Sequence, residues 1–204
     1  MTSKEYLKLL QSTLNEVDLQ SVEKMKTIFL EAHEKGSKIY TMGNGGSAAN
    51  ASHAAGDFLK GASFGLKKRF NIICLNDNTP SLMAIANDVG WDDIFIEPLK
   101  NFLKPEDVVI GISGSGNSKN VLKAIYYSKE IGAKTIGMTG FSGGELKNVC
   151  DLSIHSPAMD MEIAEDVHMA VFNMVKKEVM SVLMPKNASM GETYDNRITK
   201  EQSI

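Results

Sequence analysis

A short turn of serines and glycines constrains this chain more than any other feature of its sequence. The apolar residues 108–112 have the composition of a buried strand, and they run directly into Ser-Gly-Ser-Gly-Asn-Ser at residues 113–118. Apolar residues at helical spacing follow, beginning at Val121. Glycines let the backbone approach a ligand closely, and the free N–H groups of a helix's first turn attract an anion. The turn therefore predicts a phosphate site; an ordinary strand-to-helix turn capped by Asn117 or Ser118 is the alternative.

The same order of strand, turn and helix recurs along the chain. Such alternation predicts an α/β domain with a parallel sheet that helices cover on both faces. The 204 residues fit one such domain with extensions. The expected parts are a helical segment at 1–36, made of one long helix or two shorter ones, the α/β domain at 37–184, and a loose polar tail at 185–204. Strands are expected at 38–42, 70–75, 108–112, 135–138 and 152–155, and helices at 48–59, 80–87, 91–102, 117–131 and 161–184.

A second glycine-rich turn, Gly-Asn-Gly-Gly-Ser at residues 43–47, follows the first strand of the domain. In an open parallel sheet, ligands bind beyond the carboxyl ends of the strands, so both turns are expected to face one crevice. Neither turn carries the Gly-Lys-Ser/Thr of a nucleotide-binding P-loop, and no acidic partner stands at the spacing of a dinucleotide fingerprint. A nucleotide is therefore disfavoured as the ligand.

The composition restricts the partners of the chain. Its 22 basic and 25 acidic side chains give a formal net charge of -3, so no overall field favours nucleic acid or an anionic membrane. Cys74 and Cys150 both lie in apolar runs, which is typical of reduced cysteines in a protein core. The sequence has no N-terminal leader pattern and no apolar run long enough to span a membrane. We expect a cytoplasmic protein that binds any anion through local groups.

Four motifs, which include the two turns, lie in order at residues 43–48, 84–88, 111–118 and 140–144. Together they resemble the sedoheptulose 7-phosphate isomerase (phosphoheptose isomerase) family, which belongs to the sugar isomerase, or SIS, domain superfamily. The resemblance extends from about residue 38 to about residue 183. It implies a flavodoxin-like three-layer sandwich with a five-stranded parallel sheet, in homotetramers whose sites lie between chains.

The resemblance also implies which residues bind the sugar phosphate. It puts four serines on the phosphate and an asparagine on the sugar, together with glycines of the two turns and acidic or amide groups from other loops. The implied substrate-binding residues are Asn44, Gly45, Ser47, Asp77, Asn78, Ser113, Gly114, Ser115, Ser118 and Glu162.

The chain departs from the family's pattern at the catalytic and metal-binding positions. That pattern is a histidine with a glutamate four residues on, then a glutamine and a histidine eight residues later on the last helix, which together bind zinc in some members. Here the first pair is His53 and Asp57, and the second is Glu165 and Asn173. The family's arginine falls at Gly61. The resemblance implies catalytic roles for Asp57, Glu165 and Asn173, and a divalent metal, with zinc as a candidate, on His53, Asp57, Glu165 and Asn173.

These residue types limit the available chemistry. Aldose–ketose isomerisation moves a proton between neighbouring carbons through an enediol, which needs a base, an acid and stabilisation of negative charge. Asp57 is the candidate base, one methylene shorter than glutamate, whereas Asn173 cannot transfer protons as a histidine does. His53 and Asp57 share a helix face, and Glu165 from the last helix could join them around a metal ion. The alternative is that His53 packs or caps and Asp57 is solvated.

Two function hypotheses follow. The first is a phosphosugar isomerase that interconverts sedoheptulose 7-phosphate, or a related sugar phosphate, with the aldose D-glycero-D-manno-heptose 7-phosphate, for heptose units of surface polysaccharide. The second is a catalytically inactive SIS protein that binds sugar phosphate or regulates a partner, as a replication-initiation factor of this superfamily does. That factor also has an asparagine at the position of Asn173. A lyase or etherase acting on an amino-sugar phosphate is a third, weaker reading. His168 is expected to pack or to hydrogen-bond at a subunit contact rather than to bind metal.

Overall fold

Five parallel strands form one sheet in the computed structural model, which describes residues 1–184. The strands are β1 (Lys38–Gly43), β2 (Asn71–Cys74), β3 (Val108–Ser113), β4 (Lys134–Thr139) and β5 (Leu152–His155). Their order in the sheet is β2-β1-β3-β4-β5, so the chain reverses its direction of travel across the sheet between β2 and β3. The glycine-rich turn at residues 43–47 follows β1 and the serine turn follows β3, and these two strands pair with each other. The sheet thus brings the two turns side by side at its carboxyl edge.

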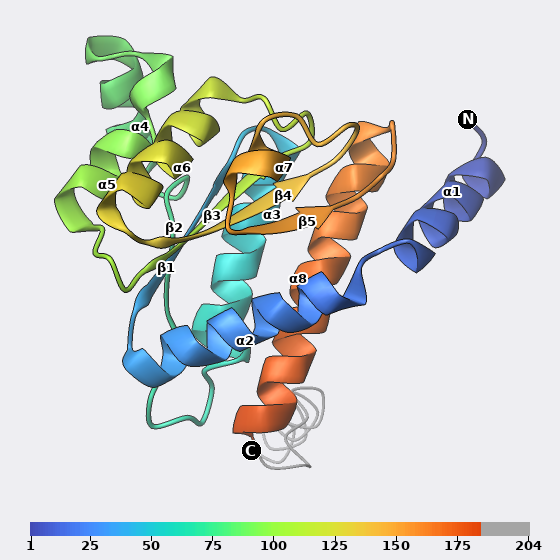
Figure 1. Ribbon diagram of the computed structural model, residues 1–204, viewed down its shortest axis with the longest axis horizontal. Helices are drawn as coiled ribbons and strands as arrows, with labels where there is room; N and C mark the ends of the chain where they lie inside the picture. Colours follow the sequence, from blue (N-terminus) through green and yellow to red (C-terminus); the bar gives the residue numbers. More distant parts are fainter. Residues whose placement is uncertain (185–204) are drawn as a thin grey trace, which may run out of the picture.

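Helices cover both faces of the sheet, which confirms the predicted three-layer α/β sandwich (Figure 1). They are α1 (Ser3–Asn15), α2 (Leu19–Lys35), α3 (Gly46–Gly56), the π-helix η1 (Asp57–Gly61), α4 (Thr79–Asp88), the 3₁₀-helix η2 (Trp91–Asp93), α5 (Ile96–Phe102), α6 (Lys119–Ile131), α7 (Leu146–Val149) and α8 (Met161–Leu183).

The N-terminal segment forms two helices, one of the two predicted alternatives, because Asp18 accepts a hydrogen bond from the Gln20 N–H and caps the start of α2. Other elements differ from the predicted ones. The single helix expected at 91–102 is a 3₁₀ turn followed by the separate helix α5. The short helix α7 and the π-helix η1 had not been predicted. The tail predicted at 185–204 lies outside the described residues.

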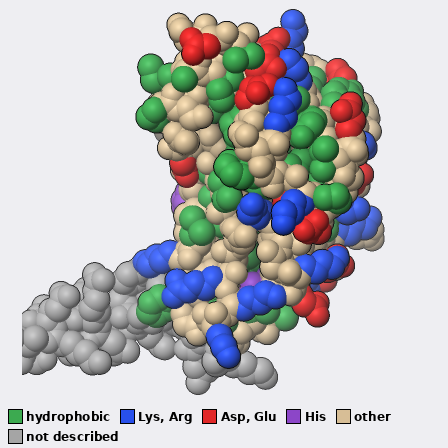
Figure 2. All heavy atoms as spheres, turned by 90° about the vertical axis from the view of Figure 1, so that its left-hand side faces the viewer, with side chains coloured by type: hydrophobic (Ala, Val, Ile, Leu, Met, Phe, Trp, Pro, Cys, Tyr) green, Lys and Arg blue, Asp and Glu red, His purple; other side chains and the backbone are tan. Residues whose placement is uncertain are grey.

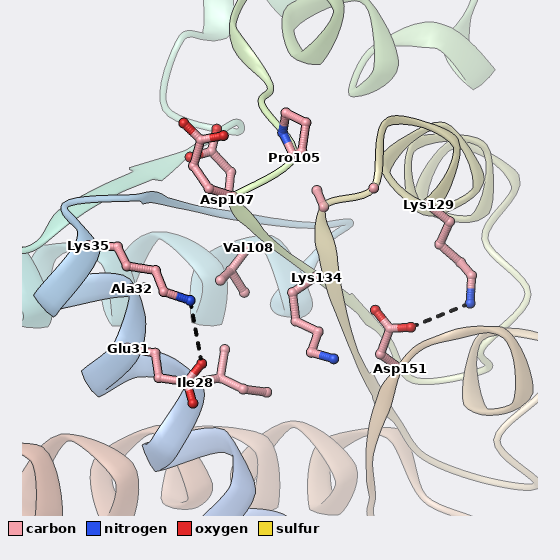
Figure 3. A pocket seen from close by; sticks show the side chains of 13 residues that line it. Ile28, Glu31, Ala32, Lys35, Pro105, Asp107, Val108, Lys129, Lys134 and Asp151 are labelled. Carbon is pink, nitrogen blue, oxygen red and sulfur yellow. Dashed lines mark ion pairs between the residues drawn. The ribbon is translucent and has the colours of Figure 1, made fainter.

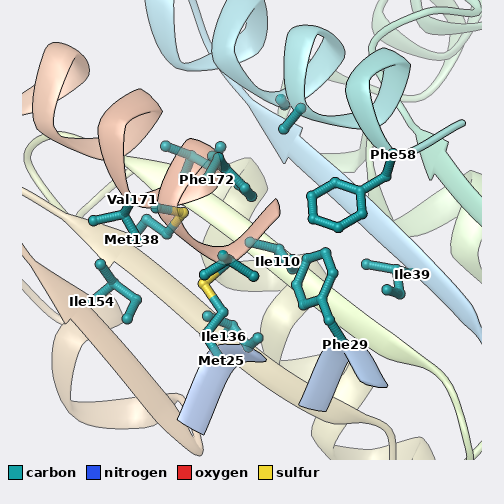
Figure 4. Packing of buried hydrophobic residues seen from close by; sticks show 14 of the residues in the cluster. Met25, Phe29, Ile39, Phe58, Ile110, Ile136, Met138, Ile154, Val171 and Phe172 are labelled. Carbon is teal, nitrogen blue, oxygen red and sulfur yellow. The ribbon is translucent and has the colours of Figure 1, made fainter. Parts of the chain in front are cut away.

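On one face of the sheet, α2, α3 and α8 pack against alternate residues of the strands. Phe29 of α2 and Phe58 of η1 meet with ring centroids 4.7 Å apart, and both side chains are fully buried. Figure 4 shows these rings beside Ile39, with Val171 and Phe172 of α8 packed over the neighbouring strands. Since α2 contributes to this core, it forms part of the domain. α1 extends from its edge (Figure 1), where Tyr6, Leu9 and Leu10 pack against the same core.

On the other face, α5, α6 and α7 cover the remaining strand residues. Tyr40 and Met42 of β1 and Val109 of β3 point to this side and are buried with Phe95 and Leu99. Gly111 of β3 leaves room for α6, because a Cβ atom there would lie 2.7 Å from Val121. The close approach of α6 to β3 sets the position of the serine turn that joins them.

Large hydrophobic side chains are exposed along the segment from α4 to α5. Met83 is 68% exposed, Trp91 61% and Phe102 58%. Figure 2 shows the face that includes this segment, where hydrophobic side chains lie between charged groups of both signs and Lys and Arg are more frequent in the lower part. Apolar surface of this kind often marks a contact with another protein. Among residues 1–184, no helix is both long and apolar enough to cross a bilayer.

Candidate functional site

The serine turn after β3 is closed by its own side chains. The backbone N–H of Gly116 donates to Ser113 Oγ over 3.1 Å, and the Ser113 and Ser118 hydroxyls lie 2.9 Å apart. Within the described residues, the Ser118 side chain forms no capping hydrogen bond to α6, although it occupies the N-cap position. Ser118 therefore occupies the predicted N-cap position, but its hydroxyl lies against Ser113 and not against the first turn of α6. Ser115 is exposed beside these groups.

Glycine is required at the tightest point of this turn. Gly116 has a φ of +68°, a region that side chains disfavour, and a Cβ atom there would lie 1.9 Å from the carbonyl oxygen of Gly143. The carbonyls of Gly114 and Gly116 accept hydrogen bonds from Gly140 and Leu146, respectively. Residues that follow β4 thus hold the serine turn in place.

The turn after β1 is held by an amide pair. Asn44 and Asn120 donate to each other's side-chain oxygens over 2.9 Å and 3.0 Å, and Asn120 is almost fully buried. Asn120 also accepts from the N–H of Val121. Gly45 has a φ of +56° and precedes the first turn of α3. Asn120 had not been predicted as a site residue; its only signal was a polar residue at the start of an otherwise apolar helix face.

The two turns enclose one hollow of about 350 Å³ at the carboxyl edge of the sheet, as their position after parallel strands predicts. Its volume is suited to a small phosphorylated molecule. Met161, the first residue of α8, lines the hollow and had not been predicted. The lining residues are Asn44, Gly45, Gly46, Ser47, Ile112, Ser113, Gly114, Ser115, Ser118, Met161 and Glu165.

Glu165 brings a carboxyl group from α8 to the N-terminus of α3. The Ser47 N–H donates to this carboxylate, and a Cβ atom on Gly46 would lie 2.1 Å from its Oε2. Burial, followed by the negative charge of Glu162, raises the pKa of the Glu165 carboxyl, and the Ser47 hydrogen bond only partly offsets this. A carboxyl group that retains its proton to a higher pH is better suited to donate one near neutrality. Glu162 itself is exposed.

Asp57 lies at the other end of α3. Its Oδ2 is 2.7 Å from Lys176 Nζ and 3.8 Å from His53 Nε2. The predicted sharing of one helix face by His53 and Asp57 is confirmed. Glu165 meets the first residues of α3 and Asp57 follows its last, so the 11 residues of α3, about 16 Å of helix, lie between the two positions. One chain does not bring them together.

The predicted metal ligands do not form a metal site within one chain. Among the described residues, no three His, Cys, Asp or Glu side chains lie close enough to hold an ion. Asn173 is exposed on α8, and the carboxylate of Asp57 is already engaged by Lys176. The geometry of the single chain therefore does not fit the divalent metal expected on His53, Asp57, Glu165 and Asn173.

Three predicted substrate residues, Asp77, Asn78 and Glu162, lie outside the hollow. Asp77 accepts a hydrogen bond from the Ser52 hydroxyl over 2.6 Å, and Asn78 caps α4 by accepting from the Ser81 N–H over 3.3 Å. Both follow β2, the edge strand. Their contacts position the loop between β2 and α4, and within this chain neither lines the hollow.

His168 is fully buried under the site. Its Nε2 lies 3.0 Å from the carbonyl oxygen of Thr139, at the end of β4. Burial lowers the pKa of His168 to about 4, so the imidazole is neutral near neutrality and Nε2–H is the donor. It packs between α8 and the sheet of its own chain, not at the chain's surface.

A second hollow, of about 400 Å³, lies at the amino edge of the sheet (Figure 3). Its side chains pair with one another: Lys35 lies 3.9 Å from Glu31, and Lys129 lies 3.7 Å from Asp151. Asp107 accepts from the backbone N–H groups of Lys38 and Lys104. This hollow had not been predicted, and its polar groups serve the strand ends.

A parallel sheet with a serine-lined hollow at its carboxyl edge is typical of α/β domains that bind a small ligand beyond the strand ends. The family profile of the SIS domain matches residues 4–140. Probable phosphoheptose isomerase of Thermoplasma volcanium is 35% identical over 175 residues, which cover 86% of this chain and 89% of that protein. Phosphoheptose isomerase of Helicobacter pylori is 37% identical over 175 residues, covering 86% and 88%. The chain belongs to the phosphoheptose isomerase family of SIS-domain proteins.

A solved structure agrees with this assignment at the level of the fold. Phosphoheptose isomerase from Neisseria gonorrhoeae superposes with a TM-score of 0.80 at 24% identity, covering 88% of this chain and 96% of that chain. The five-stranded flavodoxin-like sandwich implied by the resemblance is thereby confirmed.

Proposed function

We propose that this protein is a sugar phosphate isomerase that interconverts sedoheptulose 7-phosphate and D-glycero-D-manno-heptose 7-phosphate. The observation that carries the proposal is the hollow in which serine hydroxyls and two helix N-termini surround an acidic group, Glu165. Helix N-termini and hydroxyls bind phosphate without needing a lysine or arginine. The relatives named phosphoheptose isomerase support the choice of a seven-carbon sugar.

In this proposal, the phosphate binds Ser47, Ser113, Ser115 and Ser118, and Asn44, held by Asn120, binds the sugar. Asp57 removes a proton from C1 of the ketose, the C–H electron pair becomes the C1=C2 bond, and O2 takes a proton from Glu165. Asp57 then returns its proton to C2 of the enediol. At the same time the O1 hydroxyl gives its proton to Glu165, and C1 becomes the aldehyde carbon. Atoms and charges balance over the cycle, and neither residue is consumed.

The site is proposed to form between chains of a homotetramer. About 16 Å of helix α3 lies between the positions of Asp57 and Glu165, so the Asp57 that meets the sugar belongs to a neighbouring copy. The exposed apolar side chains from Met83 to Phe102 and the projecting helix α1 supply surface for such contacts. Asn173, exposed on α8, would then face the substrate as a hydrogen-bonding group and not as an acid.

Deuterium exchange tests the reaction directly. Purified protein is incubated with sedoheptulose 7-phosphate in D₂O, and NMR is used to detect deuterium at C2 of the aldose and at C1 of the ketose. Replacing Ser115 by Ala should raise KM by about tenfold, the effect of one lost hydrogen bond to a charged group, with a smaller effect on kcat. No exchange at either carbon would rule the isomerase out.

The second candidate is a sugar-phosphate-binding protein without turnover, which Asn173 favours because an amide cannot transfer a proton. The same experiment separates the two functions. Calorimetric binding of sedoheptulose 7-phosphate without deuterium exchange would support the binding protein, whereas exchange that depends on Asp57 would support the isomerase.

A further inference from the structure

The ion pair between Lys176 and Asp57 joins α8 to the start of η1. Nζ and Oδ2 are 2.7 Å apart, and the side chains are only 16% and 26% exposed. A fully exposed ion pair would contribute little to the stability of the fold. A partly buried pair is screened less by solvent, and its geometry is more strongly fixed.

The chain leaves space for this lysine at Gly61. A Cβ atom on Gly61 would lie 2.9 Å from Lys176 Cε and 3.0 Å from Nζ, so a larger residue would push the ammonium away. The resemblance places an arginine at position 61. Here the positive charge next to Asp57 comes instead from α8.

The local backbone is also unusual. Asp57 begins a π-helical turn, in which its carbonyl accepts a hydrogen bond from the N–H of Ala62 over 3.0 Å, five residues on. Such single turns are rare and occur frequently at functional sites. Asp57 and Gly61, four residues apart, both lie next to Lys176 of α8.

Lys176 competes with a metal ion for Asp57. Zinc binds a carboxylate oxygen at about 2.0–2.2 Å, so an ion on Oδ2 would lie within about 5 Å of the ammonium. Two cations at this distance in a partly buried site repel each other strongly. Either the lysine or the metal can pair with Oδ2, and the space over Gly61 favours the lysine.

We propose that Lys176, and not a divalent metal, is the cation that holds Asp57 in position as the proton-accepting carboxylate. The proposal rests on the isomerase function proposed above. Lys176 and His53 both approach Oδ2, which assigns proton transfer to the other oxygen, Oδ1. Lys176 is a positioning residue: it keeps its own proton throughout and acts through Asp57.

Four variants test this role by kinetics. Lys176→Met removes the charge and Gly61→Ala displaces it, while Lys176→Arg restores a cation and Lys177→Met makes the same change at an exposed position on the same helix. Lys176→Met and Gly61→Ala should each lower kcat about a hundredfold, because a base misplaced by about 1 Å loses that much, with KM changed less than about twofold. The kcat of Lys176→Arg should be about tenfold higher than that of Lys176→Met. Lys177→Met should have the same kcat as the parent protein.

The kinetic result overturns the proposal in two cases. In the first, Lys176→Met retains the parent kcat. In the second, kcat and sugar phosphate affinity fall together in proportion to a lowered thermal midpoint, and Lys176→Arg restores neither, which is the behaviour expected of a purely structural ion pair.

Zinc titration provides a readout that needs no turnover. The parent protein and Asp57→Asn should give the same calorimetric isotherm with Zn²⁺, since Asp57 is not a ligand. One Zn²⁺ bound per chain in the parent and lost in Asp57→Asn would overturn the proposal. If no sugar phosphate is converted, the isomerase function fails while this titration still decides which cation pairs with Asp57.

Discussion

The two edges of the sheet carry hollows of similar size and opposite character. The amino-edge hollow has about 400 Å³ and the carboxyl-edge hollow about 350 Å³. At the amino edge, Asp107 and Asp151 accept from backbone N–H groups at the strand starts, and Lys35 and Lys129 form ion pairs with Glu31 and Asp151 (Figure 3). At the carboxyl edge, glycines, hydroxyls and helix N-termini line the space.

This difference shows that volume does not identify a binding site. Lys35 and Lys129 at the amino edge already pair with acidic side chains of the chain, so an added anion would compete with these pairs. At the carboxyl edge, positive ends of helix dipoles converge and attract an anion from solution. Four predictions test this difference between the edges, in decreasing order of expected effect.

Gly116 and Gly132 stand at the two ends of α6, one at each edge, and both have positive φ. Gly116→Ala would place Cβ 1.9 Å from a carbonyl oxygen, so the serine turn must move, and sugar phosphate affinity should fall at least about a hundredfold. Gly132→Ala meets its nearest atom at 3.8 Å and should cost about 1 kcal/mol of stability with no change in affinity. Calorimetry measures the affinity and the stability of each variant. Equal affinities in the two variants would contradict the assignment of the site to the carboxyl edge.

His168 should make the layer beneath the carboxyl edge sensitive to acid. Its folded-state pKa is lowered to about 4 by burial, below the unfolded value of about 6.5. Its stabilising contribution is therefore present above pH 6.5 and is lost as the pH falls toward 4, by up to about 3 kcal/mol. Urea unfolding of the parent protein and His168→Gln at several pH values should give a shallower decline in the variant. Parallel declines would contradict this account.

Asp107→Ala should affect only the fold. Its carboxylate is almost completely buried and accepts from two backbone N–H groups over 2.8 Å and 3.0 Å, which would lose their partner. The free energy of unfolding should fall by about 2 kcal/mol, with sugar phosphate affinity unchanged. Chemical denaturation and calorimetry measure the two quantities. A drop in affinity at temperatures where the variant is folded would show that the amino edge contributes to binding.

The smallest effect is expected for Lys35→Met at the amino edge. Lys35 and Glu31 are 3.9 Å apart and their side chains are 65% and 59% exposed. An exposed pair of this kind contributes less than about 0.5 kcal/mol, and binding should not change. A loss above about 1 kcal/mol, or weaker phosphate binding, would mean that this hollow has a role beyond its paired charges.

The sequence was most informative where the interacting residues are close together along the chain. The strand, serine turn and helix from 108 to 131 were predictable because apolar periodicity and glycines act within a few residues. His53 and Asp57 were correctly placed on one helix face for the same reason. The break between α1 and α2 was left open, because the capping bond of Asp18 competes with a continuous apolar pattern.

The sequence by itself thus predicted the class of sheet and the two turns correctly, because local backbone preferences set both. Only the tertiary structure decided which distant side chains meet. Packing of α8 along α3 brings Glu165 to Ser47 and Lys176 to Asp57, and separates the two carboxylates that the resemblance had grouped. The pairing of β1 with β3 likewise joins Asn44 to Asn120. Sequence periodicity does not predict these pairs, because they depend on how whole helices pack against the sheet.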